Sequence, residues 1–221
     1  WAVIKANAYG HGIMRIARGL AGLADGFALL DLEDAVRLRE AGITQPILLL
    51  EGFFSPKDLP EIAARRLTVV VHTAEQLDWL ASVSLPAGTR VPLFLKINSG
   101  MNRLGIPPAQ AVAALARLRA WPHAGTIGLM THFADADGER GVEAQLDRFR
   151  PLTEGFDGPL TMANSAALLR FPQTHADWVR PGILLYGASP ATAYASAAQI
   201  GLKPVMRFEA KVIAVQHLQP G

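Results

Sequence analysis

The sequence predicts an α/β fold in which eight parallel strands alternate with helices and close into a (β/α)8 barrel. Three observations support this prediction. The apolar runs are continuous rather than alternating with polar residues, which is typical of strands that are covered by other elements on both faces. Helix-sized connections separate most of these runs. The chain length of 221 residues approaches the roughly 250 residues that such barrels use.

The eight predicted strands are short apolar runs spread over the first 180 residues. They occupy residues 2–4, 27–30, 47–50, 69–71, 91–95, 127–130, 160–162 and 178–179. An open α/β sheet is the alternative arrangement of the same strands. No GxGxxG motif follows any of the runs, so a dinucleotide-binding sheet has little support.

Helical sequence lies between these runs, and several of its ends carry capping signals. Asp31 is expected to cap the helix after the second run, and Gly42 is expected to end it. Thr73 and Gln76 form a capping box before the helix that follows the fourth run. After the fifth run, one helical face is predicted from the apolar residues Ala111, Leu115 and Leu118.

Composition and charge exclude several classes of function. The apolar content of 50% and the charged content of 18% describe an ordinary globular protein. A net charge of +2 with scattered arginines does not indicate a nucleic-acid partner. No apolar run reaches the roughly 18 residues of a membrane span, so no membrane association is expected. The absence of cysteine excludes thiolate catalysis and fits a reducing compartment such as the cytoplasm.

The domain organisation is predicted to be one complete domain and the start of another. Residues 1–188 are expected to form the barrel, and the alanine-rich, turn-prone residues 189–203 a linker. Residues 204–221 have alternating strand character, which predicts the first strand of an incomplete β-rich C-terminal domain. The sequence begins at Trp1, inside an apolar run. We therefore expect a fragment, and its targeting cannot be judged from the N-terminus.

Polar residues follow the predicted strands at their carboxyl ends. The first strand is followed by Lys5, the sixth by Thr131 and His132, and the eighth by Arg180. In a barrel, functional side chains gather at this end of the strands. These residues are therefore expected to share one site.

The first of these positions, Lys5, lies in the segment WAVIKANAYGHG. A lysine at a strand end can form a Schiff base when burial or a cofactor changes its protonation. The structural alternative is a lysine that extends into solvent. The segment resembles the pyridoxal-phosphate lysine motif of the alanine racemases. This resemblance implies that Lys5 carries pyridoxal 5′-phosphate through a Schiff base and that Tyr9 contacts the phosphate.

A second segment, LKINSGMNRLG at residues 95–105, resembles the same family. The resemblance implies that Arg103 contacts the phenolic oxygen of the cofactor and the substrate. It also implies that Lys96 is carbamylated and holds Arg103 in place, because carbamylation changes lysine from a cation to an anion. Asn98 stands where many family members have aspartate, which leaves the modification of Lys96 open.

Two further segments that resemble the family are GLMTHFADAD at residues 128–137 and WVRPGILLYG at residues 178–187. The resemblance implies that His132 lies against the cofactor ring and hydrogen-bonds Arg180, which faces the pyridine nitrogen. An arginine keeps its proton, so the ring nitrogen is expected to stay unprotonated. This would disfavour side reactions and confine the chemistry to removing and returning a proton.

A phosphate site is expected where the seventh and eighth strands end. Ser165 would supply a hydroxyl there, with Asn164 nearby. Pro181 suits the first position of a helix, which would leave the amides of Gly182 and Ile183 free for a phosphate. The structural alternative for the segment ANSAA is a helix cap.

The motifs span residues 1–187, and together their resemblance implies an isomerase that interconverts L-alanine and D-alanine for peptidoglycan synthesis. Lys5 would act as one base. The second base would be a tyrosine from the C-terminal domain of the partner subunit in a homodimer, so the isolated chain is expected to have little or no racemase activity. No metal site is predicted, because no HExxH-like histidine spacing occurs.

Other functions on the same barrel stay open at this point. One is a broad-specificity amino-acid racemase, and another is a non-catalytic protein of pyridoxal-phosphate homeostasis. A decarboxylase is disfavoured by Arg180, since decarboxylases of this type pair the ring nitrogen with a carboxylate.

Overall fold

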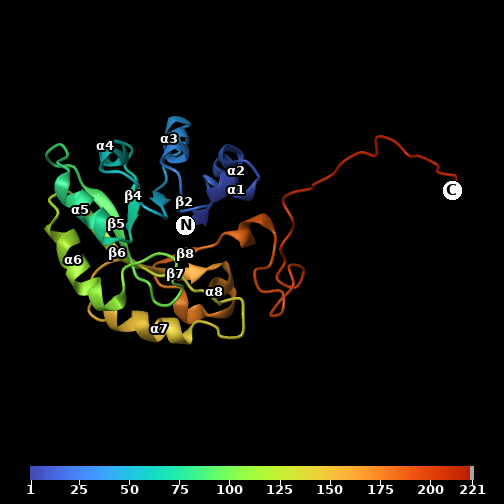
Figure 1. Ribbon diagram of the computed structural model, residues 1–221. Coiled ribbons are helices and arrows are strands. Elements are labelled where there is room, and N and C mark those ends of the chain that lie inside the picture. The colour runs from blue at the N-terminus through green and yellow to red at the C-terminus, as the bar shows by residue number, and fades with distance from the viewer. Residues whose placement is uncertain (220–221) are drawn as a thin grey trace.

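The computed structural model describes residues 1–219, and its centre is a sheet of eight parallel strands in sequence order. Figure 1 shows these strands with helices around them. The strands are β1 (Ala2–Val3), β2 (Phe27–Leu29), β3 (Ile47–Leu49), β4 (Thr68–Val71), β5 (Val91–Lys96), β6 (Ala124–Met130), β7 (Leu160–Asn164) and β8 (Trp178–Arg180).

Two hydrogen bonds join the last strand to the first. Trp1 N donates to Val179 O at 2.8 Å, and Val3 N donates to Pro181 O at 3.0 Å. The sheet is therefore closed. The predicted (β/α)8 barrel is confirmed, and the open sheet is rejected.

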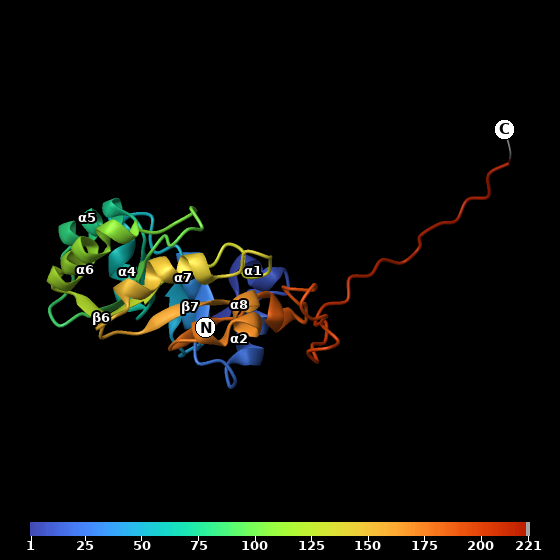
Figure 2. The ribbon, with the colours of Figure 1, turned by 90° about the horizontal axis from the view of Figure 1, so that it is seen from below.

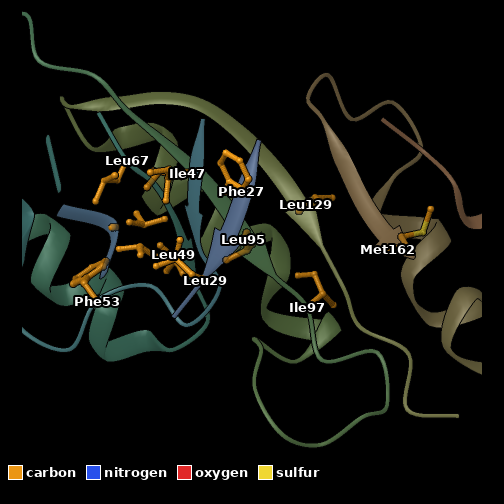
Figure 3. Close-up of a cluster of buried hydrophobic side chains, with 14 of the residues drawn as sticks. Phe27, Leu29, Ile47, Leu49, Phe53, Leu67, Leu95, Ile97, Leu129 and Met162 are labelled. Carbon is orange, nitrogen blue, oxygen red and sulfur yellow. The ribbon is translucent and has the colours of Figure 1, made fainter. Parts of the chain in front are cut away.

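The alternation of side chains along the strands divides the core into two layers. The inner layer consists of strand residues and includes Val3, Ala28, Leu48, Val70, Phe94 and Met130. Neighbouring residues such as Leu29, Val71 and Leu95 belong to the outer layer, which also contains helix residues; Figure 3 shows part of this layer. Burial on both sides explains why the strands are continuous apolar runs.

The helices begin near the strand ends and cover the outer layer. They are α1 (Lys5–Tyr9), α2 (Ile13–Leu20), α3 (Leu32–Glu40), α4 (Leu59–Ala64), α5 (Ala74–Ser82), α6 (Ala111–Ala120), α7 (Glu143–Phe149) and α8 (Ser165–Arg170). Among residues 1–219, no helix has the length and apolar content needed to cross a bilayer.

The helix ends agree with the sequence only in part. Thr73 Oγ1 accepts the N–H of Gln76 at 3.1 Å, but Gln76 Oε1 accepts from His72 N at 2.8 Å, so the capping box is incomplete. Asp31 makes no side-chain capping bond to α3, and that prediction is wrong. The Asp31 side chain is exposed, where water competes for the carboxylate. Gly42 follows α3 with a φ of 84°, as a helix end requires.

This difference predicts unequal effects of two alanine substitutions. Thr73→Ala removes a capping bond and is expected to lower the free energy of unfolding by about 1 kcal/mol. Asp31→Ala, at the equivalent position of α3, is expected to change it by less than about 0.5 kcal/mol. Urea unfolding of both variants measures the two values. Equal losses would contradict the assignment of Thr73 as a cap.

The C-terminal segment leaves the barrel as an extended tail, which Figure 2 shows from below. Residues 202–219 contain no helix or strand and are mostly exposed. The β domain expected from residue 204 onward, and the linker before it, therefore stay predictions. Residues 220 and 221 of that expected domain lie outside the described residues.

Candidate active site

All ten residues predicted for the site line one cavity of about 260 Å³ at the carboxyl ends of the strands. They come from the two ends of the chain and from its middle, and the barrel brings them together. The ten residues are Lys5, Tyr9, Lys96, Arg103, His132, Asn164, Ser165, Arg180, Gly182 and Ile183.

Lys5 is placed at the cavity by an unusual turn of the backbone. The first strand ends at Val3, one residue earlier than the sequence predicts. Residues 6–9 then all have φ between 52° and 54°, which makes one turn of left-handed helix. Such a conformation costs roughly 1–2 kcal/mol for each residue other than glycine. The turn is closed in part by Ala8 N, which donates to Ile4 O at 2.9 Å.

Arg180 is buried and held by four partners. Its guanidinium donates to Thr161 Oγ1 at 2.5 Å, Thr131 O at 2.6 Å and Met162 O at 3.0 Å, and it lies 3.4 Å from His132 Nδ1. Burial lowers the pKa of Arg180 to about 10, so it is still protonated at neutral pH. Burial and the nearby Arg180 charge lower the pKa of His132 well below its usual value. The neutral imidazole therefore accepts a hydrogen bond from a charged guanidinium.

The segment after β8 differs from its prediction in two details. The 3-10 helix η5 (Ile183–Tyr186) has Gly182 as its N-cap, so Pro181 precedes the cap instead of opening the helix. The Gly182 amide is not free, because it donates to Ser165 Oγ at 2.8 Å. The Tyr9 hydroxyl also approaches this backbone, since a Cβ at Gly182 would lie 2.5 Å from Tyr9 Oη.

Asn164 serves as the N-cap of α8. Its Oδ1 accepts the Ala167 amide at 3.0 Å, and its Nδ2 donates to Phe133 O at 3.4 Å. A helix cap is the structural alternative to a cofactor contact in this segment, and Asn164 forms this cap. Its role toward a cofactor stays a prediction.

The cavity carries an excess of positive charge. Its charged residues are the cations Lys5, Lys96, Arg103 and Arg180 and the carboxylates Glu51 and Asp137. Among residues 1–219, none of the four cations forms an ion pair. Lys96 is only 6% exposed, and burial together with Arg180 and Arg103 lowers its pKa to about 8. Such a cavity favours an anionic ligand.

The sequence reasoning missed two kinds of residue. Glu51 lines the cavity two residues after β3, and the rule that sites lie at strand ends could have indicated it. Gln145 supports the site from α7: its Nε2 donates to His132 O and to Ser99 Oγ, both at 3.0 Å, and its Oε1 accepts from Ala134 N at 2.7 Å. No sequence signal distinguishes this glutamine from a surface residue.

The family model described as the N-terminal domain of alanine racemase matches residues 1–190. The chain belongs to the alanine racemase family. The alanine racemase of Ralstonia pickettii (strain 12J) is 53% identical over 221 residues, which are 100% of this chain and 58% of that protein. The alanine racemase of Burkholderia mallei (strain SAVP1) is also 53% identical over 221 residues, again 100% of this chain, and 61% of that protein is covered. The chain thus spans about three fifths of these relatives.

Solved alanine racemase structures have the same fold. The biosynthetic alanine racemase from Pseudomonas aeruginosa superposes with a TM-score of 0.87 at 42% identity, covering 92% of this chain and 57% of that chain. The alanine racemase from Acinetobacter baumannii superposes with a TM-score of 0.87 at 36% identity, covering 98% of this chain and 61% of that chain. The resemblance stated from the motifs is thereby confirmed for the alanine racemase barrel as a whole.

Proposed function

We propose that the protein containing this chain interconverts L-alanine and D-alanine with pyridoxal 5′-phosphate bound in the barrel. The observation that carries the proposal is that all ten residues of the family-like motifs line one cavity. A racemase of this kind would supply D-alanine for peptidoglycan, in the cytoplasm and as a homodimer.

The residues of the cavity fit this cofactor. The cations, which form no ion pair among residues 1–219, suit its phosphate and phenolic oxygens, and Gly182 leaves the space that the Tyr9 hydroxyl needs. Lys5 would hold the cofactor covalently, while Tyr9, Ser165 and the amide of Ile183 would hold its phosphate. When bound, the cofactor withdraws electrons from the α-carbon of the amino acid and so makes the α-proton removable.

The side chains of the barrel then control where protons move. The Lys5 amine removes or returns the α-proton on one face of the substrate. Arg180 keeps its own proton, because its pKa of about 10 lies well above neutral, so it offers the ring nitrogen a hydrogen bond and no proton. His132 is neutral, and its Nδ1 accepts a hydrogen bond from the Arg180 guanidinium and so fixes the position of that group.

Lys96 and Arg103 are proposed to act as a pair. Unmodified, both are cations that line the same cavity, and Arg103 makes no side-chain hydrogen bond within the described 219 residues. The lowered pKa of Lys96, about 8, raises the fraction of neutral amine that can react with CO2. The resulting carbamate would hold Arg103 against the cofactor and the substrate carboxylate.

The second base is proposed to be a tyrosine of the C-terminal domain of the partner subunit. Because Lys5 acts on one face only, residues 1–221 loaded with cofactor should exchange the α-deuterium of one alanine enantiomer with water and form little of the other enantiomer. The longer protein should racemise both enantiomers. NMR for exchange and chiral chromatography for racemisation measure the two reactions. Equal racemisation rates for the two proteins would contradict the proposal.

The backbone position of Gly182 gives a separate test of the phosphate site. Gly182 has a negative φ of −118°, so the substitution removes no left-handed conformation, and the methyl group of alanine would displace the Tyr9 hydroxyl. Gly182→Ala is expected to weaken cofactor binding by about tenfold, the effect of losing one charge-assisted hydrogen bond. Spectroscopic titration with the cofactor measures this. Gly22→Ala, which has no atom within 4 Å of the new methyl, should bind the cofactor as the unsubstituted protein does.

A further inference from the structure

His72 lies beside Lys96 at the carboxyl ends of β4 and β5. Val71 and Leu95 are register partners, so the residues that follow them, His72 and Lys96, also lie side by side. Val70 and Phe94 belong to the inner layer, and Val71 and Leu95 to the outer layer. By this alternation, Lys96 faces the inner side of the barrel and lines the active-site cavity, and His72 follows β4 directly beside it.

The surroundings of the His72 ring fix its tautomer. Its Nε2 lies 3.0 Å from Glu51 O, and a carbonyl oxygen only accepts hydrogen bonds, so Nε2 carries the hydrogen. Gln76 supports the same carbonyl from α5, with Nε2 3.2 Å from Glu51 O. Nδ1 of the neutral ring is therefore a bare acceptor. It is buried and has no hydrogen-bond partner in the described part of the chain.

Two cations, Lys96 and Arg103, and one carboxylate, that of Glu51, lie near His72. His72 and Arg103 line a second cavity of about 260 Å³, and Arg103 also lines the active-site cavity. Burial, and then the charge of Lys96, lower the pKa of His72, while Glu51 raises it. A neutral His72 thus stands beside a buried lysine that makes no hydrogen bond to it.

We propose that His72 accepts a proton from Lys96 during carbamylation and then donates a hydrogen bond from Nδ1 to a carbamate oxygen. The inference rests on the proposed carbamylation of Lys96. The Lys96 ammonium gives one proton to His72 Nδ1, and the freed lone pair on Nζ bonds to the carbon of dissolved CO2. One C=O electron pair moves onto oxygen, and a second proton leaves Nζ to water.

This step provides a partner for both buried groups. Lys96 changes from a cation to an anion and His72 from neutral to a cation, so each then faces an opposite charge. The imidazolium still donates from Nε2 to Glu51 O. His72 is thus a positioning residue, since it acts on Arg103 and the substrate only through Lys96.

The test uses the longer protein supplied with ¹³C-bicarbonate, with the carbamate signal followed by ¹³C NMR and assigned by its loss in Lys96→Arg. His72→Gln keeps a side-chain N–H for Glu51 O but has no titratable group in place of Nδ1. The bicarbonate concentration that gives half of the maximal carbamate signal is expected to rise by about tenfold or more in this variant. His175→Gln is the matched control, because His175 Nε2 also lies near a carbonyl, Leu168 O at 2.8 Å, and should leave the signal unchanged.

A second measurement needs no substitution. In ¹⁵N NMR of the unsubstituted protein, His72 should be the neutral Nε2–H tautomer without bicarbonate and an imidazolium with it. An unchanged bicarbonate requirement in His72→Gln, a ring that stays neutral, or the absence of carbamate on Lys96 would each overturn the inference. Racemisation is assayed in parallel, so a protein that carries the carbamate but does not racemise alanine would reject the proposed function alone.

Discussion

Lys5→Ala is expected to lower the racemisation rate of the longer protein by about 10³-fold or more, because the substitution removes both the covalent attachment of the cofactor and a general base. The visible absorbance of the lysine-bound cofactor should disappear at the same time. The strong effect is expected because no other group can replace Lys5. Among the described residues, Lys96 is the one other lysine that lines the cavity, and it is buried and has its own proposed role. Steady-state kinetics and an absorbance spectrum measure the two effects.

The control for this substitution is Lys57→Ala. Lys57 belongs to the short 3-10 helix η1 (Pro56–Asp58), does not line the active-site cavity, and should leave rate and spectrum unchanged. A Lys5→Ala protein that kept the absorbance band would show that another group holds the cofactor. That result would remove the basis of the proposed mechanism.

Arg180→Ala is expected to lower the free energy of unfolding by about 3–5 kcal/mol, the usual effect of breaking a buried charged network. The substitution leaves the buried acceptors Thr131 O and Met162 O without their guanidinium donor. Arg180→Lys keeps the positive charge but cannot reach all partners at once, so its loss should be intermediate. Denaturant unfolding of both variants gives the values.

Arg18→Ala is the control for the loss of an arginine from the surface. Arg18 lies in α2 and is exposed, so its removal should change stability by less than about 0.5 kcal/mol. If Arg180→Ala were as stable as Arg18→Ala, the network around Arg180 would contribute nothing to the fold. The racemisation rates of the Arg180 variants would then be the only measure of its role.

The strands and the site were predictable from sequence for related reasons. A strand such as β4 is covered on both faces, so its residues form an unbroken apolar run, and polar residues such as Lys96 and His132 then stand out where strands end. The position of each strand fixes which of these residues meet. The motifs therefore identified the residues of one cavity that are more than a hundred positions apart in the chain.

Other features depend on contacts that no local pattern encodes. The left-handed turn at residues 6–9 contains no glycine, and propensities favour the right-handed form at each position. Gln145 acquires its role only because α7 packs beside Ser99 and His132. The capping prediction for Asp31 followed the residue type alone, whereas solvent exposure decided the outcome.

The closure of the barrel has a consequence for how the protein emerges from the ribosome. The bond from Trp1 to Val179 joins residues 178 positions apart, and Lys5 and Arg180 stand on either side of this seam. Residues 1–5 therefore lack their partners from β8 until residues 178–181, at the far end of the barrel, have been translated. Contacts of such long sequence separation slow folding, so we expect cofactor capture to follow translation of the whole barrel instead of accompanying it.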